Sequence, residues 1–320
     1  MKKKNLLKLF LVIMAVLFVT GCTKQLTDSD KKAVKNPTTG QTLTENILCQ
    51  PTDEETISLY LENNVDLSKL PKCENFSVTS GGYEGLWTSI FVKPLAWAII
   101  KIGSFAKNYG VGLIVVSLLI RLIAFPLTRK TAVQSELMKE AKPKLDKLEE
   151  KYKRQEEKFK NEGKNNQEYQ AMMMKKNQEM MMIYKEYNIS PLAGCLYALL
   201  QIPLFIAFLE AINRVPAIFE ESLLGFQLGT TPLTGLTNGN FLYLILTVIV
   251  GLTTFYSFKL NSASNPDNQQ MKMMSRVMVI MILVTSVFMT AALNVYWVTT
   301  NLFTVVQNLL VIKKKEKEKV

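Results

Sequence analysis

Residues 112–130 read GLIVVSLLIRLIAFPLTRK, a stretch apolar enough for a membrane helix that nevertheless holds Arg121 between apolar neighbours. A helix of about 20 apolar residues crosses the roughly 30 Å hydrocarbon core of a bilayer. An arginine inside that core costs about 2.5–3.5 kcal/mol on insertion scales. Arg121 is therefore expected either to extend its side chain to the cytoplasmic edge or to face a water-filled cavity.

Four further apolar stretches join this one and predict an all-α membrane protein with five transmembrane helices. The predicted spans are residues 108–128, 191–212, 241–259, 275–291 and 293–312. The whole chain is 48% hydrophobic with a formal net charge of +11. The segments between the spans are therefore polar enough to lie in water.

Residues 85–107 form a sixth apolar stretch, which Lys93, Pro94 and Lys101 interrupt. Its Trp97 suits a membrane interface. The N-terminus is expected outside if Cys22 is lipidated, and the lysine-rich C-terminus is expected in the cytoplasm. A chain that starts outside and ends inside must cross the membrane an odd number of times. We therefore expect this stretch to lie along the outer surface as an interfacial amphipathic helix.

The basic residues indicate the orientation, because cytoplasmic loops are rich in Lys and Arg. Residues 129–189 hold 15 of them and are predicted to be cytoplasmic. The 260–274 loop and the basic tail at 313–320 are predicted to lie on the same side. The 213–240 loop has only Arg214 as a basic residue and is predicted to be outside.

The N-terminus, MKKKNLLKLFLVIMAVLFVTGC, has a basic start, an apolar centre and small residues before a cysteine. This pattern predicts a lipoprotein signal peptide at 1–21, with Cys22 as the lipidated first residue of the mature chain. The alternative is an uncleaved anchor with an incidental cysteine.

Residues 22–84 are predicted to be an extracytoplasmic polar segment, either a tether or a small cap. Cys49 and Cys73 would lie in this oxidising compartment, where they can form a disulfide. Two free thiols are the alternative.

The cytoplasmic segment 129–189 is predicted to be a helical hairpin, because apolar residues recur every three or four positions on both sides of a polar break near 161–165. Methionines cluster at 172–174 and 180–182. They either pack between the two arms or form an adaptable apolar surface that receives varied chains.

Polar side chains recur inside several predicted spans and form a stripe along 293–312. Hydrogen bonds between helices would account for neutral groups but not for Arg121. A wet, positively charged groove accounts for both. Its candidate lining residues beside Arg121 are Ser117, Gln201, Trp297, Thr300, Asn301 and Thr304.

The chain contains no histidine, and its four cysteines include no C-x-x-C pair. Histidine bases and ligands are therefore excluded, and no phosphate-binding loop is evident. We expect no catalytic residue, no metal and no cofactor, and hence no enzyme. A small-anion transporter with its site at Arg121 is an alternative, but the two halves show no repeat. An intramembrane enzyme would need paired aspartates or a Ser–Lys dyad, which the spans lack.

Three stretches together resemble the YidC/Oxa1/Alb3 membrane protein insertases, in their Gram-positive lipoprotein form. They are NYGVGLIVVSLLIRLIAFPLT (108–128), NISPLAGCLYALLQIPLFIAF (188–208) and ALNVYWVTTNLFTVVQNLL (292–310). The resemblance covers about residues 85–312 and does not extend to residues 23–84.

The resemblance implies a five-span bundle around a hydrophilic groove that is open to the cytoplasm and lipid but closed outside. Arg121 corresponds to the family's groove arginine, and Gln201 and Trp297 to its lining residues. The implied function is an insertase or chaperone that integrates nascent membrane proteins, alone or with the Sec translocon.

The resemblance also implies the partners and the location. Nascent membrane proteins, membrane lipids and the Sec translocon are the expected partners, with the ribosome or the signal recognition machinery as further candidates. No nucleic acid specificity is expected. The expected location is the bacterial cell membrane, with a lipid-anchored N-terminus outside and the C-terminus in the cytoplasm.

Overall fold

The computed structural model describes residues 23–161, 166–190, 193–261 and 269–318. The predicted signal peptide at 1–21, Cys22, the hairpin turn at 162–165 and residues 262–268 of the 260–274 loop lie outside the described residues. The chain divides into two compact units. The first unit comprises residues 1–123, 200–254 and 281–303, and the second comprises residues 124–199, 255–280 and 304–320.

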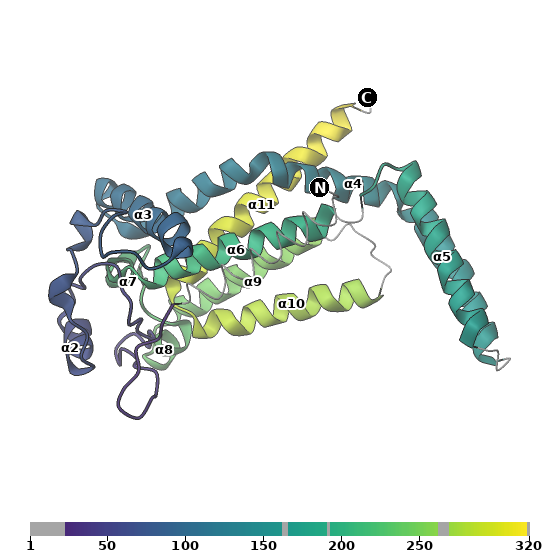
Figure 1. Cartoon of the computed structure of the whole chain (residues 1–320). Coiled ribbons are helices and arrows are strands. Elements are labelled where there is room, and N and C mark those ends of the chain that lie inside the picture. Colours follow the sequence, from purple (N-terminus) through teal and green to yellow (C-terminus); the bar gives the residue numbers. More distant parts are fainter. Residues whose placement is uncertain (1–22, 162–165, 191–192, 262–268, 319–320) are drawn as a thin grey trace. The chain divides into compact units, whose positions relative to one another are not determined.

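Helices make up most of the described chain, as the sequence predicts (Figure 1). The α-helices are α2 Glu54–Glu62, α3 Lys93–Ala106, α4 Tyr109–Asn161, α5 Asn166–Glu186, α6 Ala193–Asn213, α7 Pro216–Glu220, α8 Pro232–Thr237, α9 Leu242–Asn261, α10 Gln269–Phe288 and α11 Ala291–Glu318. Short helical turns lie at Leu67–Lys69 and Cys73–Asn75, and a π-helix, η3, spans Thr88–Val92.

By length and composition, three described helices are apolar enough to cross a membrane: Thr88–Ala106, Tyr109–Pro126 and Leu242–Leu260. Gln201–Asn213 and Arg276–Phe288 are shorter apolar helices. The first of the three coincides with the stretch expected to lie along the surface. Composition and length therefore do not distinguish a surface helix from a span there, and the count of five spans stays a prediction.

The cap, which we define as residues 23–84, is folded and belongs to the first unit. Isolated β-bridges connect its first part, and Leu26, Leu43, Ile47 and Tyr60 form a small core of their own. Burial raises the pKa of the Tyr60 hydroxyl, which donates to the Thr44 carbonyl at 2.9 Å. A polar composition thus still supplies enough apolar residues for a local core.

A disulfide joins Cys49 to Cys73, with their Cα atoms 4.9 Å apart. Both cysteines belong to the main apolar cluster of the first unit, together with Phe76 of the cap and Ile99 and Ile100 of α3. The cap is therefore attached to the helices by the same core that holds the helices together.

Glycines allow α3 and α4 to touch backbone to backbone. α3 ends at Lys107, whose positive φ of 56° and bonds to the last carbonyls close the helix. The Asn108 side chain then caps α4 by accepting from the Val111 N–H at 3.1 Å. A Cβ on Gly112 would lie 2.4 Å from the Ile99 carbonyl oxygen and 2.7 Å from the Gly103 nitrogen, so only glycine fits there.

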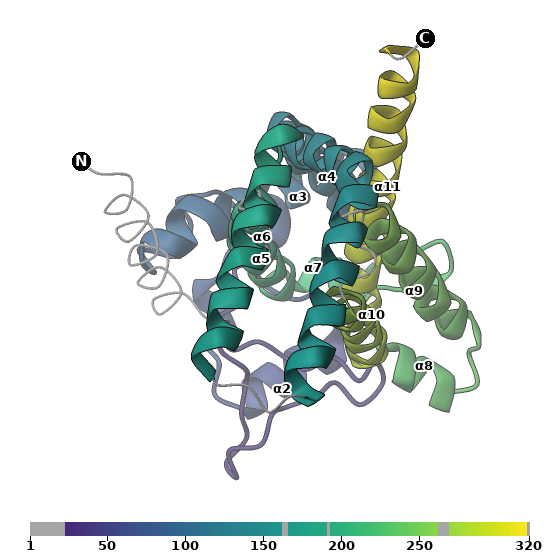
Figure 2. The same cartoon turned by 90° about the vertical axis from the view of Figure 1, so that its right-hand side faces the viewer.

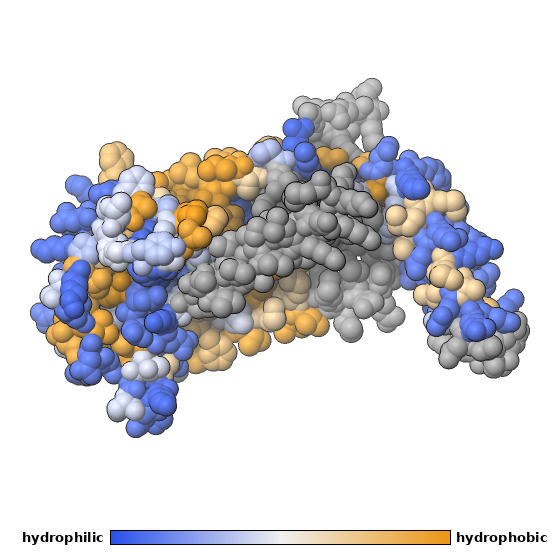
Figure 3. Space-filling view, viewed as in Figure 1, coloured by the Kyte–Doolittle hydropathy of each residue, from blue (hydrophilic) through white to orange (hydrophobic). Residues whose placement is uncertain are grey.

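Figure 3 shows hydrophobic side chains gathered over the first part of α4 in the first unit and hydrophilic ones over the cap. Leu119, Leu122 and Ile123 of α4 are among the exposed apolar residues. Apolar side chains on the outer face of a helix are expected where lipid replaces water around it.

Between α7 and α8 a two-stranded hairpin pairs β1 (Ser222–Leu223) with β2 (Phe226–Gln227) in antiparallel register. Leu224 and Gly225 both have positive φ, of 52° and 86°. That pair of conformations is typical of the tight turn that joins two twisted strands.

In the second unit, the C-terminal part of α4 and α5 lie side by side (Figure 2). Their contacts are apolar and form two adjoining clusters, of Met138, Ala141, Leu145, Tyr184 and Ile189, and of Leu148, Tyr152 and Met172. Met172 is thus buried in the seam, whereas Met174, Met181 and Met182 are exposed. Packing between the arms therefore accounts for Met172, while the adaptable surface stays a prediction for the exposed methionines.

An ion pair links the two helices of the second unit at their exposed edge. Lys151 Nζ lies 2.8 Å from a Glu179 carboxylate oxygen, and the Tyr152 hydroxyl donates to the same carboxylate at 2.9 Å. The bonds from Lys151 and then Tyr152 hold the pKa of the Glu179 carboxyl below its usual range.

We predict that Gly112→Val prevents normal packing of α3 on α4. Overpacking a tight contact typically costs about 1–3 kcal/mol, so less folded protein and a lower thermal unfolding temperature in detergent are expected. Gly251→Ala is the matched control, because its Cβ would meet only the side chain of Leu283, which can move. Equal loss of stability in both variants would contradict the backbone contact.

We predict that Glu179→Gln loosens the contact between α4 and α5 at neutral pH. A carboxyl with a lowered folded-state pKa stabilises the fold above its unfolded pKa of about 4.3, and that stability is lost as pH falls through the folded-state pKa. Hydrogen exchange of amides around Lys151 should be faster in the variant at pH 7. The difference from wild type should shrink as the pH falls below about 4.3 and disappear once the pH is below the folded-state pKa. A difference that persists at low pH would rule out the charge as its cause.

Candidate functional site

Arg121 of α4 contacts Gln201 of α6 in the first unit. Its Nη1 donates to the amide Oε1 of Gln201 at 3.1 Å, and both side chains are half-buried. Eighty residues separate the two in sequence. The structure thus brings the two principal predicted groove residues together, and the amide accepts a hydrogen bond without cancelling the positive charge.

Glu210 lies nine residues beyond Gln201, which corresponds to about 13 Å along a helix. This carboxylate is buried and accepts from the Trp87 indole N–H at 3.1 Å. It therefore lies at a different depth along α6 from Arg121, as its position in the sequence indicates.

Ser117 lies one helical turn before Arg121 but is buried. Its hydroxyl donates to the Leu113 carbonyl at 2.6 Å within the same helix. A side chain that bonds back to its own helix is satisfied there, so this hydroxyl has less need of a cavity than the prediction supposed.

The polar stripe of α11 contacts more than one neighbouring helix in the first unit. Trp297 stacks on Phe205 of α6, with ring centroids 6.2 Å apart and planes 4° from parallel. The buried Thr300 donates to the Trp297 carbonyl at 3.1 Å, and Asn301 donates to Thr254 Oγ1 of α9 at 2.8 Å. Trp297 is half-buried beside α6, while Asn301 connects α11 to α9.

Thr304 belongs to the second unit, where the α11 stripe continues. There the Thr128 hydroxyl of α4 donates to Gln307 Oε1 at 2.9 Å, and both residues are buried. α11 is therefore bonded to α4 in the second unit and to α9 in the first.

Buried charges that the sequence did not single out lie where the cap meets the helices. Arg214 and Lys93 are both 1% exposed. Arg214 donates through Nε to the Asn46 carbonyl at 2.6 Å and through Nη2 to Glu84. Sequence reasoning treated Arg214 as a loop residue and Lys93 as an interruption of an apolar stretch. In both cases, the sequence feature that could have indicated burial was a single basic residue next to a long apolar run.

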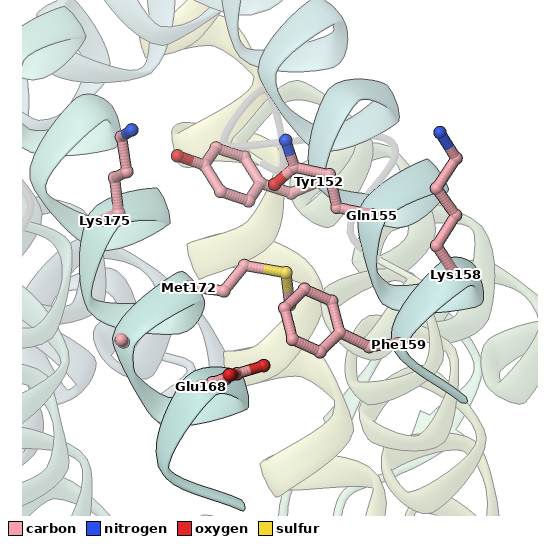
Figure 4. A pocket seen from close by; sticks show the side chains of 8 residues that line it. Tyr152, Gln155, Lys158, Phe159, Glu168, Met172 and Lys175 are labelled. Atoms are coloured by element: carbon pink, nitrogen blue, oxygen red, sulfur yellow. The ribbon is translucent and has the colours of Figure 1, made fainter. Parts of the chain in front are cut away.

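A hollow of about 480 Å³ lies between α4 and α5 in the second unit (Figure 4). Met172 reaches from α5 toward Phe159 of α4, and Tyr152 stands beside them. Lys158 and Lys175 line the hollow from opposite arms. The hollow is apolar at its centre, and its edge carries charges of both signs, because Glu168 lines it together with the two lysines.

In the described part of the chain, no group of three or more Cys, Asp or Glu residues is arranged to hold a metal ion.

Comparison with known proteins finds a matching family model, relatives of similar sequence and a similar solved structure. The family model described as 60Kd inner membrane protein matches residues 101–319. "Membrane protein insertase YidC" of Oceanobacillus iheyensis is 38% identical over 238 residues, covering 72% of this chain and 85% of that protein. "Membrane protein insertase MisCA" of Bacillus subtilis is 36% identical over 227 residues, covering 70% and 78%.

A solved structure titled "Active YidC insertase crystal structure with the first transmembrane domain resolved" is similar with a TM-score of 0.49 and 19% sequence identity. The similarity covers 79% of this chain and 50% of that chain. The present chain therefore matches about half the length of that solved chain.

We predict a measurable coupling between Asn301 and Thr254. Hydrogen bonds between membrane helices average about 0.6 kcal/mol in double-mutant cycles. Asn301→Leu, Thr254→Val and the double variant should give a coupling of that order when thermal unfolding in detergent is measured. Asn308→Leu, on the same helix, should show no coupling to Thr254. Fully additive losses for Asn301 and Thr254 would contradict the bond.

Proposed function

Because the chain belongs to the 60Kd inner membrane protein family, which includes the YidC insertases, we propose that it integrates nascent membrane proteins through a hydrophilic groove that carries Arg121. Members of this family insert membrane proteins and are not enzymes. The bond between Arg121 and Gln201 carries the proposal, because it combines a cation, a neutral acceptor and partial exposure within apolar helices.

In this mechanism Arg121 attracts the polar, acidic tail of an incoming protein. Water in the groove lowers the cost of carrying polar backbone part of the way across the membrane. The amide oxygen of Gln201 accepts from Nη1 at 3.1 Å and so helps to orient the guanidinium, which is half-exposed, toward an arriving anionic group.

The apolar segment of the client then moves from the groove into lipid. Its own transfer from water into hydrocarbon drives this step, since each fully buried apolar side chain gains about 1.5–3 kcal/mol. The membrane potential adds about 2.3 kcal/mol per elementary charge per 100 mV for negative charge carried outward. No nucleotide is required.

The second unit offers a first contact for clients on the cytoplasmic side. Met174 and Met182 are about 60% exposed, and flexible methionines adapt to different apolar partners. The hollow beside Met172 offers an apolar centre to such a client, with Lys158, Lys175 and Glu168 at its edge. The Sec translocon is a proposed partner, as are the ribosome and the signal recognition machinery.

The proposed topology has five membrane spans, a lipid anchor on Cys22 outside and the C-terminus in the cytoplasm. The disulfide between Cys49 and Cys73 supports an oxidising location for the cap. The exposed basic side chains of α4 and α5 support a cytoplasmic location for residues 129–189.

We predict that Arg121→Ala impairs insertion of clients with acidic tails, by about tenfold if roughly 1.4 kcal/mol of charge attraction is lost. Arg121→Lys should largely preserve insertion, since it keeps the charge. Reconstituted vesicles and protease protection of the client tail provide the measurement.

Arg129→Ala is the matched control, because it removes an exposed cation from the same helix. Wild-type insertion by Arg121→Ala for every client tested would refute the charge role. Flux of a small anion without any insertion would favour a transporter instead.

A further inference from the structure

Two cations are buried where the cap meets the outer ends of the apolar helices. Lys93 is the first residue of α3, and Arg214 directly follows α6. Both are 1% exposed. A buried cation is tolerated only where charged or hydrogen-bonding partners replace the water it has lost, so the partners of these two residues show what this region is built to hold.

One carboxylate serves both cations. Glu84 Oε1 lies 3.6 Å from Lys93 Nζ, and Glu84 Oε2 accepts from Arg214. Glu84 is the last residue of the cap, immediately before the segment that leads into η3. A single side chain therefore connects the start of α3 to the end of α6.

The remaining partners are backbone groups of the cap. Lys93 Nζ donates to the carbonyls of Ser80 and Gly82 at 2.7 and 2.6 Å. Arg214 Nε donates to the Asn46 carbonyl, and its own carbonyl accepts from the Leu48 N–H at 2.8 Å. The acceptors come from the middle of the cap and from its C-terminal end, so the two cations hold two of its loops against the helices.

Along α6, a mostly apolar buried layer separates this cluster from the candidate groove. Gln201 and Arg214 are thirteen residues apart, or about 20 Å of helix. Between them Ala207, Phe208 and Ile212 are almost completely buried, and Phe208 stacks on Tyr296 of α11 with ring centroids 4.5 Å apart. The same stretch holds the buried carboxylate of Glu210. A route for water from Arg121 outward along this face would therefore have to pass this buried layer and then the cluster.

We propose that Glu84, Lys93 and Arg214 form an ionic lock that holds the cap over the outer ends of α3 and α6 and keeps the Arg121 groove closed to the outside. Each is a positioning residue. The inference rests on the proposed function, which requires an aqueous groove open to the cytoplasm. The family match begins at residue 101, so Glu84 and Lys93 belong to a part of the chain that lies outside it.

The test measures from which side of the membrane a cysteine in the groove is accessible. The reporter is Gln201→Cys in the full chain with Cys195→Ser, and the probe is a membrane-impermeant maleimide. The probe is added either to intact cells or to inverted membrane vesicles. With the lock intact, we expect labelling from the cytoplasmic face only.

Breaking the lock with Glu84→Gln leaves both cations without their shared carboxylate. We expect outside labelling to rise by on the order of tenfold, because an uncompensated buried charge strongly favours local opening. Glu84→Asp keeps the carboxylate and should remain within about twofold of the parent. Asp66→Asn is the matched control, since it removes an exposed ion pair with Lys69 from the same cap.

The outcomes separate the two proposals. An absence of cytoplasmic labelling in the parent would refute the aqueous groove, and the lock with it. Cytoplasmic labelling combined with unchanged outside labelling in Glu84→Gln would overturn the lock alone. If that variant does not accumulate, Lys93→Gln takes its place, because it removes one cation of the cluster and leaves the carboxylate paired with Arg214. Outside labelling that stays at the parent level would likewise overturn the lock.

Discussion

The cost of burying a cation among apolar helices is the constraint on which the first unit depends. A charged side chain taken out of water loses several kcal/mol of solvation, and only nearby oxygen acceptors restore it. Arg121, Lys93 and Arg214 all face this constraint, and each obtains acceptors from outside its own helix. The way in which α4, α6 and the cap pack together follows from these pairings as much as from the apolar core.

The three cations are satisfied in two different ways, and the difference bears on function. Lys93 and Arg214 are almost fully buried and share one carboxylate, which offsets one of their two positive charges, while carbonyls of the cap accept further hydrogen bonds. Arg121 donates to an amide oxygen and is half-exposed. In the proposed function, the first arrangement fixes the cap and the second is where an anionic group of a client arrives.

Part of the fold and of the site can be predicted from sequence alone. A cation inside an apolar run is a local signal, and so are the polar residues of α11 and the apolar periodicity of α4 and α5. Gln201 could be proposed as a partner of Arg121 because it is a polar residue within an apolar helix. Predicting that these two side chains touch requires a related protein or a structure, because no local sequence pattern shows which helices are neighbours.

The burial of Lys93 could not be predicted from local sequence signals. Within the sequence it interrupts an apolar stretch, and that appearance favoured a surface helix for residues 85–107. In the fold its ammonium group is enclosed by carbonyls from a segment ten to thirteen residues earlier and by Glu84. Whether a lysine lies at a surface or within a core depends on the acceptors that surround it, and these are assembled only on folding.

The sequence by itself determined the helical class, the apolar runs, the basic segment at 129–189 and the membership of the family, because each of these is a property of composition, period or motif. Only the tertiary structure decided that the polar N-terminal segment folds as a cap, that Cys49 bonds to Cys73, and that Arg214 is buried against Glu84. The physical reason is that hydrogen bonds and ion pairs between distant segments depend on distance and desolvation, which exist only after the apolar core has brought those segments together.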